Sequence, residues 1–133
     1  MAFETSVWIV IGLSVFAELF EAAWQQADTL RGAIENGYRY YQRSIFLFLV
    51  MHAGYVLTLF VSLYYNLLNW PIIGILAFKT LDIFFKLDMI GRLHGHRELT
   101  PEMEAMLVTP IPRWYFLAGV MAYPWFMYVA FDV

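Results

Sequence analysis

Residues 5–24 read TSVWIVIGLSVFAELFEAAW, and this stretch decides the fold class. It is apolar over about 20 residues, the length that an α-helix needs to cross a hydrocarbon core of about 30 Å. Its only charged residues are Glu18 and Glu21, near its end. Since lipid offers no hydrogen-bond partner to an open backbone, the stretch predicts a transmembrane helix.

Three further apolar stretches of similar length follow, at residues 44–65, 70–90 and 114–131. Together they predict an all-α integral membrane protein, a four-transmembrane-helix bundle in a single domain over residues 1–133. The composition agrees, because 62% of the residues are apolar and only 14% are charged. That charge is too low to cover a water-facing surface, so we expect the bundle to be surrounded by a lipid bilayer.

The composition also excludes several functions. The net charge of −3 argues against binding to nucleic acid, since no basic face is large enough to follow phosphates. The absence of cysteine excludes disulfides, thiolate metal sites and cysteine nucleophiles. No glycine-rich phosphate loop and no serine in a nucleophile motif is present, so the sequence favours a protein that is not an enzyme.

The connections between the stretches predict the orientation. Residues 25–43 read as a polar loop with three arginines, and residues 91–113 form a longer connection with three more. The turn at residues 66–69 carries no charge. The positive-inside rule therefore places the first and third loops in the cytoplasm and both termini outside, in a bacterial inner membrane.

The third loop contains a helix signal of its own. Thr100, Pro101 and Glu102 are typical of an N-cap, a proline at the first helical position and an acid in the first turn. We expect a short amphipathic helix to about Leu107, lying on the membrane surface.

Polar residues recur at helical spacing inside the predicted spans. The first span carries Ser14, Glu18, Glu21, Gln25 and Asp28, and the third carries Lys79, Asp82 and Lys86. The second span contributes His52. Charged residues within a membrane usually face the bundle interior, so spans one to three are predicted to enclose a polar core. The fourth span, with Ala118 and Ala122 at the spacing of closely packed helices, is predicted to pack outside this core or against a second subunit.

Depth along the helices suggests how these residues pair. Counted from the outer boundary, Glu21 and Lys86 lie at one level and are matched for an ion pair. Glu18, Asp82 and His52 share a second level. Lys79, one turn from Asp82, could instead neutralise that carboxylate.

Three interpretations of the Glu18, Asp82 and His52 layer remain open. It could be a hydrogen-bonded network that fixes the helix register. It could bind a proton or a cation, because two adjacent carboxylates in a low dielectric cannot both ionise cheaply. It could also hold a transition metal, with all three side chains as ligands, or a haem between the His52 residues of a symmetric dimer. His94 and His96, with Glu98, form a weaker surface metal candidate or simply a solvated loop.

The chain resembles the small multidrug exporters in having four predicted helices and a glutamate in the first. It differs in its second acid there, its charged third span and its one-sided loop charge. We therefore transfer no residue role from that family.

The prediction that follows is a small membrane transport or channel protein for a proton or cation. Glu18 and Asp82 are its predicted binding carboxyls, His52 a relay or ligand, and Lys79 and Lys86 tune the charge together with Glu21. Four short helices enclose little space, so we expect a homo-oligomer. The alternatives are an assembly or anchoring subunit that docks a cytoplasmic or membrane partner through residues 99–108, and a haem-bearing electron-transfer subunit. The sequence identifies no cofactor.

Overall fold

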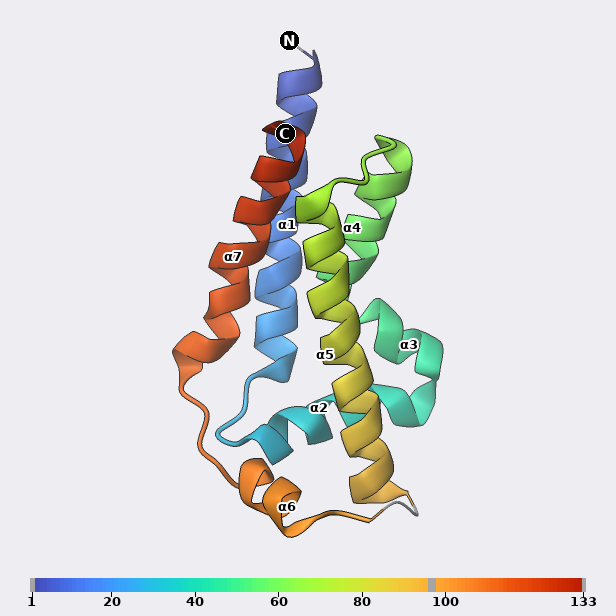
Figure 1. Ribbon diagram of the computed structural model, residues 1–133, viewed down its shortest axis with the longest axis vertical. Helices are drawn as coiled ribbons and strands as arrows, with labels where there is room; N and C mark the ends of the chain where they lie inside the picture. Colours follow the sequence, from blue (N-terminus) through green and yellow to red (C-terminus); the bar gives the residue numbers. More distant parts are fainter. Residues whose placement is uncertain (1, 96–97, 133) are drawn as a thin grey trace.

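The computed structural model describes residues 2–95 and 98–132. Within them the chain is all-helical apart from one isolated β-bridge between Thr29 and Pro110, so the predicted all-α class is confirmed. The helices of residues 2–25, 70–94 and 113–132 run along the molecule, and those of residues 30–43 and 101–107 lie at the end away from the chain termini (Figure 1). The helices are α1 Ala2–Gln25, α2 Leu30–Arg43, α3 Ile45–Val50, α4 Ala53–Tyr64, α5 Trp70–His94, α6 Pro101–Leu107 and α7 Arg113–Asp132.

Two segments are long and apolar enough to cross a membrane by length and composition, Thr5–Gln25 in α1 and Arg113–Asp132 in α7. Helix α5 has 25 residues, but charged side chains interrupt its apolar character. The predicted span 44–65 is divided between α3 and α4, which have 6 and 12 residues. The helices alone therefore give two candidate spans and not the predicted four.

Residues 25–43 are not the loop that their polarity predicts, because α2 occupies most of them. Thr29 caps this helix, and its hydroxyl oxygen accepts a hydrogen bond from the Gly32 N–H at 3.2 Å. Ala33, Ile34 and Gly37 recur at helical spacing and are buried. An amphipathic helix with a narrow apolar stripe has a low mean hydropathy, which resembles that of a polar loop.

Helix α6 forms where the N-cap signal predicts it. The Thr100 hydroxyl oxygen accepts from the Met103 N–H at 3.2 Å, and Pro101 is the first helical residue. Its apolar side is not free, because Leu107 is only 2% exposed and packs in the core beside Ile34 of α2.

The turn before α5 also fixes α7. Asn69 caps α5 through its side-chain oxygen, and its side-chain N–H donates to the Ala130 carbonyl at 2.7 Å. Near the other end of α7, the Ile111 N–H donates to the Asp28 carbonyl at 2.8 Å. Both ends of the α7 region are therefore attached to other parts of the chain.

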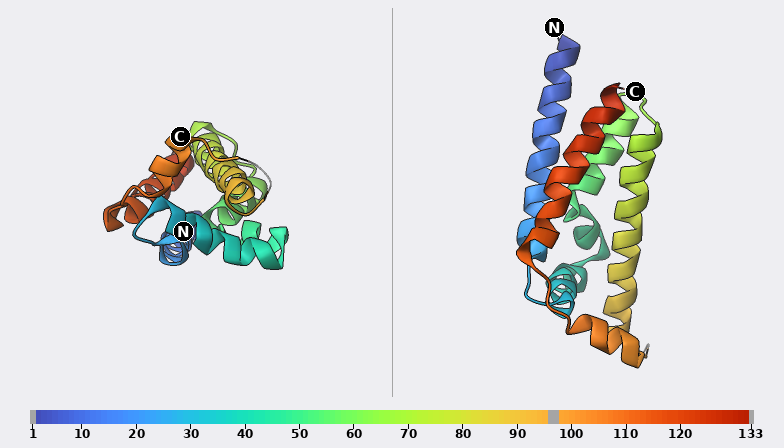
Figure 2. Two further views of the ribbon diagram at one scale, coloured as in Figure 1. Left: turned by 90° about the horizontal axis from the view of Figure 1, so that it is seen from below. Right: turned by 60° about the vertical axis from the view of Figure 1, so that its left-hand side comes forward.

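Helix α7 packs along α1 and also contacts α5, and the right-hand view of Figure 2 shows α1 and α7 side by side. The prediction that the fourth apolar segment packs outside the polar core is wrong. Ala118, Gly119 and Ala122 line a cavity shared with α1 and α5. Small residues allow α7 to approach α1 closely, which brings Tyr123 to the polar core.

The bundle buries charged residues and exposes large apolar ones, which is unusual for a water-soluble protein. The buried polar and charged residues are Ser14, Glu18, Glu21, His52, Thr58, Lys79 and Lys86. Large apolar side chains point outward instead, with Phe16 73%, Leu63 82% and Met121 80% exposed. Along α5, Lys79 lies between Ile75 and Ile83, which belong to two separate apolar cores. The buried charges therefore occupy a layer with apolar packing on both sides.

Candidate functional site

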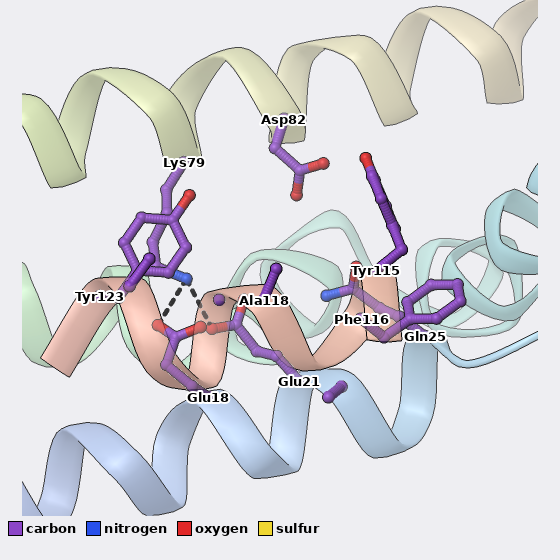
Figure 3. A pocket seen from close by; sticks show the side chains of 12 residues that line it. Glu18, Glu21, Gln25, Lys79, Asp82, Tyr115, Phe116, Ala118 and Tyr123 are labelled. Carbon is purple, nitrogen blue, oxygen red and sulfur yellow. Dashed lines mark hydrogen bonds and ion pairs between the residues drawn. The ribbon is translucent and has the colours of Figure 1, made fainter. Parts of the chain in front are cut away.

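One buried ion cluster is centred on Lys79. Helix α1 supplies Glu18 and Glu21 one turn apart, and α5 supplies Lys79 (Figure 3). The Lys79 Nζ atom lies 2.7 Å from Glu18 Oε1 and 2.9 Å from Glu21 Oε2. All three side chains are less than a tenth exposed. One ammonium group thus faces two carboxylates in a site largely closed to water, where their attraction is weakly screened.

Two further elements complete the surroundings of this Lys79 cluster. The Tyr123 ring of α7 lies under the ammonium group, with Lys79 Nζ 4.2 Å from the ring centroid, a cation–π distance. The backbone N–H of Gly54, at the start of α4, donates to Glu21 Oε2 at 3.0 Å. Glycine at position 54 lets these carboxylates approach the backbone, because an added Cβ would clash with Glu18 Oε1 and would lie 2.6 Å from Glu21 Oε2 unless those side chains shifted.

A second cluster is centred on Lys86, two turns further along α5. Its Nζ atom donates to Asp82 Oδ2 at 2.5 Å and to Gln25 Oε1 at 2.8 Å, and lies 3.1 Å from His52 Nε2. The other ring nitrogen of His52 lies 2.9 Å from the Phe48 carbonyl, which can only accept a hydrogen bond. Nδ1 therefore carries the proton, Nε2 accepts from Lys86, and His52 is neutral in this arrangement.

The break between α3 and α4 lies between these two clusters. His52 leaves the helical conformation with φ −83° and ψ 69°. Each backbone group that the break releases has a side-chain partner. The Phe48 carbonyl accepts from the His52 ring, and the Met51 carbonyl accepts from Trp24 Nε1 at 2.9 Å. The Gly54 N–H donates to Glu21. Two of the three partners come from α1, so α1 holds the break in place.

A cavity of about 310 Å³ opens beside both clusters, between α1, α5 and α7. Glu18, Glu21, Lys79 and Tyr123 line one part of it, and Figure 3 shows their side chains converging. Gln25, Asp82, Tyr115 and Phe116 line the rest. The Asp82 side chain is 48% exposed, far more than the Glu18 and Glu21 side chains, which also line the cavity. Polar groups at one wall and small or aromatic residues at the other make the cavity amphipathic.

These contacts revise the pairing predicted from depth. Glu21 pairs with Lys79, and Lys86 pairs with Asp82, so the predicted Glu21–Lys86 ion pair is wrong. The predicted layer of Glu18, Asp82 and His52 is divided, with Glu18 at the Lys79 cluster and the other two at the Lys86 cluster. Each depth was counted from the outer end of its own span, so a shift of α1 relative to α5 changes which carboxylate meets which lysine.

The described residues that were predicted as metal ligands contact other protein groups. Across residues 2–95 and 98–132, no three His, Asp or Glu side chains gather closely enough to hold a metal ion. His94 stacks on Tyr38 with ring centroids 3.7 Å apart, and its Nε2 lies 2.6 Å from Glu35 Oε1. His96 lies outside the described residues.

Sequence reasoning missed Tyr123 and Gly54. Span four carries no charge in its interior, so nothing singled out one of its tyrosines. Gly54 lies within a predicted continuous helix. Its role in the site depends on contacts with carboxylates that are more than 30 positions earlier in the chain. Gln25 carried a usable signal, because it continues the polar stripe of Glu18 and Glu21.

Comparison with protein-family models, with curated proteins and with solved structures gives no significant match for this chain.

Proposed function

We propose that this chain is an integral membrane protein that crosses the bilayer four times, through α1, the broken pair α3 and α4, α5, and α7. The combination of buried charges and exposed large apolar side chains supports this proposal. Outward-facing Phe16, Leu63 and Met121 would be costly against water, whereas buried Glu18 and Lys79 are what a bundle in lipid requires. A broken helix is tolerated within a membrane where the protein itself satisfies the freed backbone, as it does around His52.

The same proposal includes the orientation. Helices α2 and α6 lie at the end of the bundle opposite the chain termini (Figure 1). That end carries Arg31, Arg39, Arg43 and Arg113, and the sequence next to the termini and the turn at residues 66–69 carries no lysine or arginine. By the positive-inside rule this end faces the cytoplasm of a bacterial inner membrane.

Within this membrane protein, we propose that the two clusters move a proton or a monovalent cation. The observation that carries the proposal is an excess of negative charge beside a cavity. Glu18, Glu21 and Asp82 contribute three carboxylates, while Lys79 and Lys86 contribute two ammonium groups. His52 is neutral, so one negative charge is unmatched. A proton or a cation entering from the cavity would neutralise it.

The packing favours a carrier over a continuous pore. Beyond the Lys79 cluster, toward the termini, the interior is filled by Val10, Val61, Ile72, Ile75 and Met127. Among the residues whose side chains the structure describes, this apolar cluster lies between the Lys79 cluster and the end that carries the termini. The cavity then corresponds to a binding site open toward one side, and transport would need α7 and α5 to separate on the other side.

Ion flux across purified, reconstituted protein tests the proposal. Liposomes with wild-type protein and an internal pH-sensitive dye, or an imposed cation gradient, should show flux above that of protein-free liposomes. Glu18→Gln should reduce that flux to the protein-free level, because it removes the unmatched charge. Glu102→Gln, an exposed carboxylate on α6, is the matched control and should leave the flux unchanged. Equal flux in Glu18→Gln and wild type would contradict the proposal.

The two alternative functions have less support. An iron-ligating His52 would have to give up its contact with Lys86 at 3.1 Å. Docking of a partner through residues 99–108 would have to use a helix whose Leu107 is already buried against the chain itself. The homo-oligomer stays a prediction, which cross-linking in the membrane would test.

A further inference from the structure

The groups around Lys79 form a binding seat for an ammonium group. Two carboxylate oxygens lie 2.7 and 2.9 Å from the nitrogen, and an aromatic face lies 4.2 Å away. Charge-assisted hydrogen bonds and a ring face are the chemistry by which proteins recognise ammonium compounds. A divalent metal would require more oxygen ligands than this seat supplies.

The seat opens onto the cavity through small residues. Gly119 of α7 leaves room for Glu18, since a Cβ there would lie 3.4 Å from Glu18 Oε2 and 3.2 Å from the Tyr123 ring. Glu18 Oε1 binds Lys79, so its second oxygen lies toward α7 and the cavity wall. The cavity of about 310 Å³ is far larger than a small primary amine. An incoming ammonium group can therefore approach the carboxylate that Lys79 occupies.

We propose that Lys79 is a tethered occupant of a site for primary ammonium ions, and that a cation arriving from the cavity displaces it. The inference rests on the proposed cation transport and names its substrate class. When the seat is empty of ligand, the lysine returns and neutralises Glu18 and Glu21, which would otherwise be left unpaired in a low dielectric. The flexible four-carbon stem of lysine permits this exchange.

The test measures binding of methylammonium chloride to purified protein in detergent micelles by isothermal titration calorimetry. Lys79→Ala vacates the seat and should bind methylammonium at least about tenfold more tightly than wild type. Lys79→Ala/Glu21→Gln keeps the wild-type charge of the cluster and removes the risk that two unpaired carboxylates prevent folding. It should also bind more tightly than wild type. Adding Glu18→Gln to that variant should abolish binding.

Two controls define the seat. Lys86→Ala empties the neighbouring cluster and should give no gain. Tetramethylammonium, which has no N–H to donate, should bind Lys79→Ala more weakly than methylammonium does. A melting curve of each variant establishes that it is folded. A rise in the melting temperature of Lys79→Ala when methylammonium is added would also indicate binding at the seat.

An affinity in folded Lys79→Ala/Glu21→Gln no greater than that of wild type would overturn the inference, and so would an equal gain in Lys86→Ala. Either result, together with proton flux that Glu18→Gln abolishes, would remove the ammonium assignment and leave the proposed function standing. A gain in binding without any flux would support the ammonium site and contradict the proposed transport function.

Discussion

The two buried lysines of α5 differ in what neutralises them. Lys79 is enclosed by two carboxylates and a ring face, all from other helices. Lys86 has one carboxylate, Asp82 of its own helix, and two neutral partners, Gln25 and His52. Asp82 is half exposed to the cavity, whereas Glu18 and Glu21 are almost fully buried. The first lysine therefore neutralises an excess of buried acid, and the second meets one half-exposed carboxylate and two neutral groups.

The largest expected effect tests this contrast directly. Lys79→Met leaves two carboxylates buried without a counter-ion, and we expect it to lower the free energy of unfolding by about 3–5 kcal/mol. Lys86→Met leaves one carboxylate, Asp82, which the cavity can hydrate, and removes the donor to the neutral His52 ring, so its loss should be about 1–2 kcal/mol. Unfolding in detergent micelles, followed by circular dichroism, measures both. Equal losses would show that the two clusters are energetically alike.

A smaller effect should come from disturbing the Lys79 cluster without removing a charge. Gly54→Ala places a Cβ against Glu18 and Glu21, so the carboxylates must shift away from Lys79. We expect destabilisation of about 1–3 kcal/mol, the usual range for overpacking. Gly12→Ala is the matched control, because a Cβ there meets nothing within 4 Å, and it should be neutral or slightly stabilising. Similar melting temperatures for the two variants would contradict the packing around Gly54.

The smallest expected effect concerns the side of the break near Lys86. Trp24→Phe removes the hydrogen bond to the Met51 carbonyl and keeps most of the ring that contacts His52. We expect a loss of about 1 kcal/mol, typical of one hydrogen bond. Amide hydrogen exchange should accelerate in α3 and at the start of α4 and stay unchanged in α5. Faster exchange throughout the protein would mean that Trp24 supports the whole fold and not the break alone.

Local signals predicted much of the helical architecture. The N-cap at Thr100 and the spacing of Glu18 and Glu21 on one helix face depend on neighbours within a turn or two, and both appear in the structure. The break at His52 could not be predicted in this way. No proline or glycine interrupts the chain at Met51 or His52, and the partners that stabilise the break come from α1.

Pairing between helices was likewise beyond sequence spacing. Which carboxylate meets Lys79 depends on the relative shift of α1 and α5, and an error of about two turns exchanges Glu21 between the two lysines. The involvement of Tyr123 depends on the close approach of α7, which Ala118 and Ala122 indicated without specifying the helix approached. The residue types therefore indicated which charged side chains are buried, but their spacing did not identify the partners of those side chains.

The Lys79 cluster has a consequence for biosynthesis. Its groups come from four helices, and Glu21 precedes Lys79 by 58 residues. In the proposed membrane protein, α1 is translated before the lysine that neutralises its two glutamates, so we expect its final charged form to be stable only after α5 is translated.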